Sequence, residues 1–259
     1  MAAFVQRLTQ RGRALAGRLW RALGFGPRFR RKRSVLARRY IRGSGIEIGA
    51  LNEPLTLPPG SSVRYVDCLD LPALRTLYPR IAGEPLAPVD VIDDGERLER
   101  FADASVDFVV ANHFIEHTED PIGAIEAHLR VLRPGGILFM AVPDKRRTPD
   151  WARSETSLEH LLRDHRDGPE WSRRSHFEEW AGQVIWAADP EREADRLEEA
   201  GYSIHFHVWT RERFGELLEY LRETLGFPFR LSELEPNRHE FVAVLQKTGA
   251  GAPAVKRAE

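Results

Sequence analysis

Short apolar runs alternate with helical segments between residues 45 and 143. Each run is short and largely apolar, which is typical of strands buried within a parallel sheet. The runs occupy residues 45–50, 62–67, 88–93, 106–112 and 137–143. Helices are expected at 71–77 and 121–132, the second with Asp120 as its N-cap and Pro121 in its first turn. This alternation predicts an α/β fold with helices on both faces of the sheet and ligands bound at the carboxyl ends of the strands.

The pattern breaks after residue 143 and later resumes. Residues 144–200 are polar and charged but hold four of the six tryptophans, which predicts a helical insertion that caps the sheet. Further strands are expected at 202–209 and 239–247, with a helix at 211–223 between them. The prediction is therefore one doubly wound, mostly parallel sheet of seven strands.

Charge divides the chain into a basic arm and an acidic body. Residues 1–42 contain 13 Lys and Arg residues and no acidic residue, so the remainder carries a net charge of -14 although the whole chain has -1. The hydrophobic content of 42% is enough for a core and excludes global disorder. The single cysteine excludes a disulfide framework, and no apolar run is long enough to span a bilayer. We expect a cytoplasmic protein.

The arm, residues 1–43, is expected to form two basic helices, an amphipathic one at 2–24 and another at 28–41. The folded domain is expected at 44–247, followed by a disordered tail at 248–259. The amphipathic helix suits an anionic surface such as the inner membrane, and packing on the sheet as a cofactor lid is a second interpretation. A mitochondrial presequence is less favoured. No nucleic-acid partner is expected, because the acidic body would repel phosphates.

Acidic residues end the first three predicted strands. The first strand ends in Glu47-Ile-Gly49-Ala50-Leu51, where Gly49 lets a ligand approach the backbone closely. Asp67 ends the second strand, where a carboxylate in a nucleotide-binding sheet accepts from ribose hydroxyls, and Asp94 follows the third. Three such acids in succession predict an adenosine ligand.

Residues 90–144 contain the most specific motifs, an Asp-Phe strand, ANHFIEH and RVLRPGG. This stretch resembles the class I S-adenosylmethionine-dependent methyltransferases, and GIEIGALNEPL, PDKR and IHFHVW are similar to a bacterial subgroup of methyltransferase-domain proteins. The resemblance implies a Rossmann-like sheet with S-adenosylmethionine as cofactor. It would place Glu47, Gly49 and Ala50 in the cofactor loop, Asp67 at the ribose, Asp94 and Gly95 at the adenine, and Asn112 and His113 beside the methionine group. Leu51 and Glu53 stand where the family usually has further glycines, which leaves the pose of the methionine group open.

The predicted activity is methyl transfer to a small-molecule or glycan acceptor, at oxygen. A base is required only if the acceptor must lose a proton. Candidate catalytic residues are His113, His117, Asp144 and His207, and a structural role is the alternative for each. Lys145 accompanies Asp144, and His205 shares a face with His207 if residues 202–209 form a strand.

Two other functions remain open. The altered glycine motif would also suit a non-catalytic module that binds the cofactor without transfer. His113-Phe-Ile-Glu-His117 fits a short zinc-peptidase pattern, but it follows a strand instead of lying in a long helix. We therefore predict no metal ligands.

Overall fold

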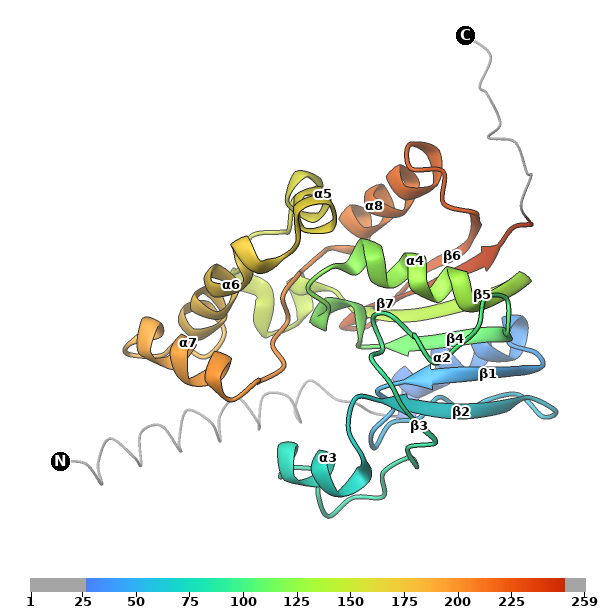
Figure 1. Cartoon of the computed structure of the whole chain (residues 1–259), viewed down its shortest axis with the longest axis horizontal. Helices are drawn as coiled ribbons and strands as arrows, with labels where there is room; N and C mark the ends of the chain where they lie inside the picture. Colours follow the sequence, from blue (N-terminus) through green and yellow to red (C-terminus); the bar gives the residue numbers. More distant parts are fainter. Residues whose placement is uncertain (1–26, 250–259) are drawn as a thin grey trace, which may run out of the picture.

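A seven-stranded sheet forms the centre of the molecule in a computed structural model that describes residues 27–249 (Figure 1). The strand order is β3-β2-β1-β4-β5-β7-β6. The strands are β1 (Ser44–Ile48), β2 (Ser62–Asp67), β3 (Val91–Ile92), β4 (Val106–Asn112), β5 (Leu132–Pro143), β6 (Phe229–Asn237) and β7 (Glu240–Lys247). The first five pair in parallel, while β7 pairs antiparallel with both β5 and β6. The predicted seven-stranded, mostly parallel α/β sheet is confirmed.

One predicted strand is wrong. Residues 202–209 pair with the sheet only through an isolated bridge between Trp209 and Asp144, and the seventh strand is β6, which the sequence did not indicate. Ile204 and Phe206 of this segment are buried against the cap helices and Trp209 is buried in the core of the sheet, so its hydrophobicity reflects burial and not strand pairing. Strand β6 escaped prediction because it is an edge strand of mixed polarity that ends in Glu-Pro-Asn.

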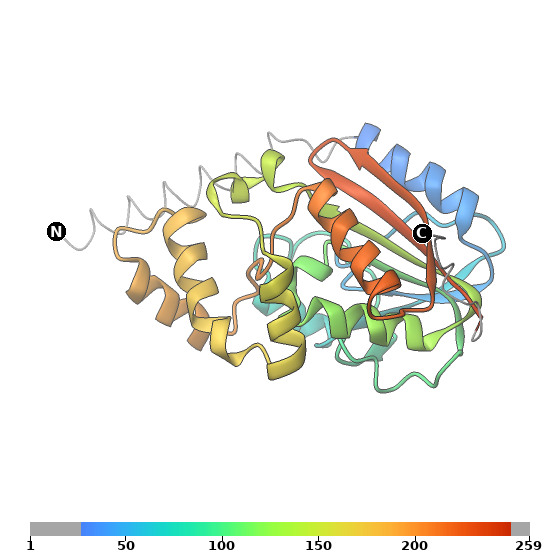
Figure 2. The same ribbon diagram turned by 90° about the horizontal axis from the view of Figure 1, so that it is seen from above.

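Helices cover both faces and one edge of the sheet. They are α2 (Pro27–Tyr40), α3 (Leu71–Leu77), α4 (Pro121–Val131), α5 (Leu158–Asp167), α6 (Glu170–Gln183), α7 (Pro190–Glu199) and α8 (Arg211–Glu223). Alternate residues of β4 divide between two cores, since Val109 and Ala111 pack with α4 and α8 while Phe108 and Val110 face α2. Figure 2 shows α2 on the opposite side of the sheet from α4 and α8. The central sheet is therefore buried on both faces, which explains its continuously apolar strands.

Helix α2 belongs to the packed structure. Leu36, Ala37 and Ile41 are buried against the sheet, and the Arg33 side chain forms a buried ion pair with Glu240 on β7. The expected domain start near Ser44 is therefore too late, because packed structure already begins within α2. The predicted helix at 2–24 and the last residues of the expected tail, 250–259, lie outside the described residues.

The Trp-rich insertion forms a helical cap made of α5, α6 and α7, as predicted. These helices lie beyond the carboxyl ends of β1 and β4 (Figures 1 and 2). Phe177 and Ala181 of α6 pack with Leu197 of α7 and with Ile204 and Phe206. The cap therefore joins the rest of the domain through the 202–209 segment and through α5, whose Leu161 packs into the core of the sheet. Within residues 27–249, no helix is long and apolar enough to cross a membrane.

Candidate active site

The side chain of Glu47 holds the loop after β1 through hydrogen bonds with the loop backbone. Both carboxylate oxygens of this buried side chain accept from the backbone N–H of Leu55, at 2.9 and 3.1 Å. Burial raises the pKa of Glu47 to about 7, although the Leu55 hydrogen bond opposes the shift. Glu47 thus shapes the loop that was expected to bind the cofactor, by closing residues 48–55 into a turn.

Leu51 adopts a backbone conformation that glycine normally occupies. Its φ is 47°, close to the 62° of Gly49, and it stands at one of the positions where the related family usually has glycine. The turn is held by a hydrogen bond from Glu53 N to Ala50 O at 2.9 Å and by one from Ala87 N to Leu51 O at 2.7 Å. The loop therefore keeps the shape of the glycine motif despite the leucine, at a strain of about 1–2 kcal/mol.

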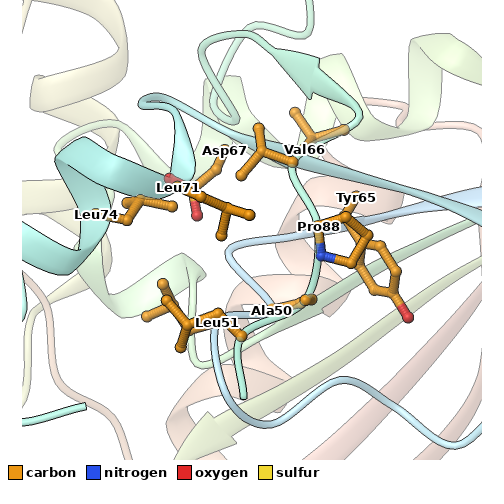
Figure 3. A pocket seen from close by; sticks show the side chains of 11 residues that line it. Ala50, Leu51, Tyr65, Val66, Asp67, Leu71, Leu74 and Pro88 are labelled. Carbon is orange, nitrogen blue, oxygen red and sulfur yellow. The ribbon is translucent and has the colours of Figure 1, made fainter. Parts of the chain in front are cut away.

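Asp67 ends β2 beside a small cavity. Its carboxylate accepts from Cys68 N at 2.9 Å, and burial raises its pKa. Figure 3 shows Asp67 with Ala50, Leu51 and Pro88 around this cavity, whose volume of about 10 Å³ holds about one water molecule. This cavity is too small to hold a nucleoside.

Asp94 and Gly95 form the turn after β3. Asp94 is exposed, and its carboxylate accepts from Glu96 N at 2.9 Å. Gly95 is buried, and a Cβ at its position would lie only 2.5 Å from Ile48 and 2.8 Å from Phe114. The close packing of Gly95 therefore fixes this turn against the end of β1.

Asn112 and His113 lie at the end of β4. Both amide atoms of the Asn112 side chain are buried and have no hydrogen-bond partner among the described residues, so they are available to a bound ligand. His113 has a φ of 51°, which turns its ring away from the strand direction. Its Nε2 lies 2.8 Å from Glu240 and its Nδ1 lies 3.2 Å from Glu116.

His113 lies between two carboxylates that favour its charged form. Burial alone would lower its pKa, but hydrogen bonds to Glu116 and Glu240 outweigh burial and raise the pKa to about 9. Glu240 also binds Arg33 of α2, so one chain of charges joins α2, β7 and the end of β4. Since a charged imidazole cannot accept a proton, these contacts favour His113 as a positive charge at the site over a role as a base.

His117 lies in a second cluster of side chains, together with His205 and Asp150. His117 Nδ1 is 2.8 Å from the Ile204 carbonyl, which can only accept, so Nδ1 donates and Nε2 carries the lone pair. Burial and the neighbouring His205 lower the pKa of His117 to about 4. The two rings meet edge to face at 4.7 Å, and His205 Nδ1 donates to Asp150 at 2.8 Å. This histidine relay, His117, His205 and Asp150, contains an imidazole that is neutral near pH 7.

The other two candidate residues lie elsewhere. Asp144 is buried and forms two hydrogen bonds with Arg146, at 2.9 and 2.6 Å, and it also caps the turn that follows β5. His207 is buried beneath the cap, with Nε2 3.1 Å from the Glu119 carbonyl. The two histidines of the 202–209 segment therefore do not share one site.

The structure adds residues that the sequence did not single out as site residues. Glu116, Asp150 and Glu240 are buried carboxylates that contact the histidines, and only Glu116 lay in a quoted motif. His113 and His117 contact different groups of partners, so the zinc-peptidase arrangement of the HFIEH segment is not formed.

Comparison with known proteins indicates the reaction that this protein catalyses. Residues 59–140 match the family model of a methyltransferase domain. This chain carries a methyltransferase domain. The enzyme is an S-adenosylmethionine-dependent methyltransferase, and the class I resemblance seen in its motifs is confirmed. The buried Asn112 amide, which has no hydrogen-bond partner among the described residues, the open space beside Gly49 and the carboxylate of Asp67 fit that cofactor.

Solved structures of methyltransferases are similar to this one. A methyltransferase of Methanosarcina mazei is 20% identical, with a TM-score of 0.43 over 81% of this chain and 95% of that one. One of Aquifex aeolicus is 12% identical, with a TM-score of 0.47 over 90% and 98%. A putative methyltransferase of Methanococcus maripaludis is 16% identical, with a TM-score of 0.44 over 96% and 94%. No curated protein matches the chain.

Proposed function

We propose that this methyltransferase transfers a methyl group to a hydroxyl oxygen of a small-molecule or glycan acceptor. The observation that supports oxygen is the histidine relay. A hydroxyl must lose its proton as it attacks, and a neutral imidazole can accept that proton. The pKa of His117, about 4, keeps its ring unprotonated at neutral pH and also makes it a weak base. In the relay, the Asp150 carboxylate fixes the His205 ring, which contacts the ring of His117.

Each residue of the proposed site would have a separate role in binding or proton transfer. S-adenosylmethionine supplies an activated methyl group on a sulfonium, so much of the catalysis is positioning of the acceptor in line with it. Asp67 would hold the ribose hydroxyls, and the Asn112 amide would bind the methionine group. The positive charge of His113 would attract the carboxylate of that group. His117 would take the acceptor proton on Nε2.

Calorimetry with S-adenosylmethionine and S-adenosylhomocysteine tests the cofactor site. Asp67→Ala should weaken binding of either by about 1–3 kcal/mol, because it removes hydrogen bonds to the ribose. Asp103→Asn is the matched control, since this exposed side chain pairs with Arg130, is not among the proposed site residues and should leave affinity unchanged. Equal affinities for the wild type and Asp67→Ala would remove Asp67 from the site.

Incubation with labelled S-adenosylmethionine and a cell extract tests the acceptor. We expect label in methyl ethers, and label confined to amines or thiols would contradict transfer to oxygen. His117→Gln should lower the transfer rate about 100-fold or more without changing cofactor affinity. Cofactor binding with no transfer to any component would favour the non-catalytic module.

The N-terminal arm is proposed to contact an anionic membrane surface, on the strength of its cations and of the apolar face predicted at 2–24. Because the apolar face of α2 packs on the sheet, the proposed apolar contact with the membrane rests on the predicted helix at 2–24. Sedimentation with anionic liposomes should therefore be lost in a chain that begins at Pro27. Equal sedimentation of both chains would exclude the anchor.

A further inference from the structure

Four potential metal ligands converge beneath the cap, outside the proposed active site. His160 and Asp164 lie one turn apart on α5, His176 lies on α6, and His207 lies on the segment that joins cap and sheet. We name them the cap cluster. Each offers one ligand atom, and all four atoms lie within 4.8 Å of one another. Helices α5 and α6 are neighbours at this end of the molecule (Figures 1 and 2).

The spacing of the atoms suits a metal ion. His160 Nε2 lies 3.1 Å from His176 Nε2 and 3.1 Å from Asp164 Oδ2. In tetrahedral zinc sites the ligand distances of about 2.0–2.1 Å place neighbouring ligand atoms about 3.3–3.4 Å apart. Both observed separations are slightly shorter than that value, so a cation could bind with small side-chain movements.

The Asp164 carboxylate is oriented by one oxygen and open at the other. Oδ1 accepts from Ser172 Oγ at 2.9 Å, whereas the buried Oδ2 accepts no hydrogen bond from any described residue despite its nearness to two imidazoles. This arrangement is expected of a carboxylate that binds a metal through one oxygen while a hydrogen bond to the other oxygen orients it. A buried carboxylate with an unsatisfied oxygen is otherwise unfavourable.

His207 shows the same two-sided arrangement. Nε2 of this ring lies 3.1 Å from the Glu119 carbonyl, which can only accept, so Nε2 donates. Nδ1 then carries the lone pair, and this buried atom has no hydrogen-bond partner among the described residues. Metal-binding histidines commonly donate the other ring nitrogen to a carbonyl in this way.

The chemical types of the four side chains match a zinc site. Three imidazole rings and one carboxylate supply the nitrogen and oxygen ligands that zinc binds. Burial lowers the pKa of His176 to about 4 and holds the pKa of His207 well below its ordinary value, which is compatible with this arrangement.

We propose that His160, Asp164, His176 and His207 bind one divalent transition-metal ion of the Zn²⁺ class. Four protein ligands leave no open position, so the ion would be structural. It would join α5, α6 and the 202–209 segment, and thereby fix the cap on the sheet. This proposal departs from the prediction of no metal ligands, because His160 and Asp164 were not recognised and the segment around His207 was expected to be a strand.

The test is zinc content and affinity of the full, tag-free chain. After treatment with a chelator and reconstitution with Zn²⁺, the wild type should retain one equivalent of zinc through dialysis. Zinc should also raise the thermal unfolding temperature. Asp164→Asn should abolish both effects, since it exchanges the charged ligand for an amide of equal size. Ser172→Ala should weaken zinc affinity about 10–100-fold by releasing the carboxylate.

Matched controls locate the ion. His165→Gln changes the next histidine of α5, which pairs with Asp120 at 3.0 Å, and should leave zinc binding unchanged. His117→Gln addresses the group of Glu116, His117 and His205 and should also have no effect. If Asp164→Asn does not fold, His160→Gln replaces it, because His160 is only partly buried. Absence of zinc binding by the wild type, or its loss in His117→Gln with retention in His160→Gln, would overturn the proposal.

Discussion

Two groups of buried histidines in this enzyme carry different charges. His113 at the end of β4 lies between the carboxylates of Glu116 and Glu240 and is protonated near neutral pH. In the cap cluster, three imidazoles share the single carboxylate of Asp164, and burial keeps His176 and His207 neutral. The number of carboxylates for each imidazole therefore decides whether burial leaves the ring charged. A charged ring can attract an anion, whereas neutral rings can bind a cation.

Among the substitutions that test this difference between charged and neutral histidines, Glu240→Gln should cause the largest loss of unfolding free energy. It leaves Arg33 and His113 as buried cations without their shared carboxylate, and breaking such a pair costs about 3–5 kcal/mol of unfolding free energy. Urea unfolding at pH 7 measures the loss. Glu235→Gln is the matched control, because its pair with Lys32 is partly exposed and should contribute at most about 1 kcal/mol. Equal losses in the two variants would show that Glu240 does not organise a buried charge chain.

Stability should fall on both sides of neutral pH, for opposite reasons. The folded pKa of His113 lies above that of the unfolded chain, so its contribution is complete below about pH 6.5 and disappears as pH rises through about 9. His117, His128 and His176 have folded pKa values of about 4, below their unfolded values. Their neutral, buried forms are fully favoured above about pH 6.5, and stability decreases as pH falls towards 4.

The free energy of unfolding, measured between pH 4.5 and 9.5 with chelator present throughout, separates these two effects. They give an acid limb, where stability falls with decreasing pH, and an alkaline limb, where it falls with increasing pH. His113→Gln should flatten the alkaline limb and leave the acid limb unchanged. His128→Gln should reduce the slope of the acid limb only, since the His128 ring is buried and bonded to the Gly95 carbonyl at 2.8 Å. An alkaline limb that is the same in the wild type and His113→Gln would contradict the assignment of a charged His113.

Local signals in the sequence predicted much of the fold and part of the candidate site. The strand at 62–67 and the helices at 71–77 and 211–223 have the predicted bounds, because apolar periodicity and caps such as Asp70 and Thr210 act within a few residues. The segment 202–209 was misread, since an apolar run buried by helices resembles one buried in a sheet. Periodicity alone does not distinguish the two.

The charges of the site could not be predicted because they depend on contacts between distant residues. Arg33, His113 and Glu240 are separated by more than 75 positions in the chain, and only the pairing of β5 with β7 brings Glu240 beside the end of β4. His160 and Asp164 have helical spacing, but neither indicated a site until α6 and the 202–209 segment packed against α5. The motif residues thus located the candidate site, and the tertiary contacts determined its chemistry.

Asp164→Asn in metal-free protein should give the smallest effect and complete the comparison with Glu240→Gln. The amide oxygen can still accept from Ser172, and no described residue donates a hydrogen bond to Oδ2. Without metal, we therefore expect a change of only about 0.5–1.5 kcal/mol in unfolding free energy. With saturating Zn²⁺ the gap between wild type and variant should widen, because only the wild type gains binding energy. Urea unfolding with chelator and with zinc measures both values. A loss with chelator as large as that of Glu240→Gln would mean that the fold already uses the Asp164 charge, which would then not be held available for a metal ion.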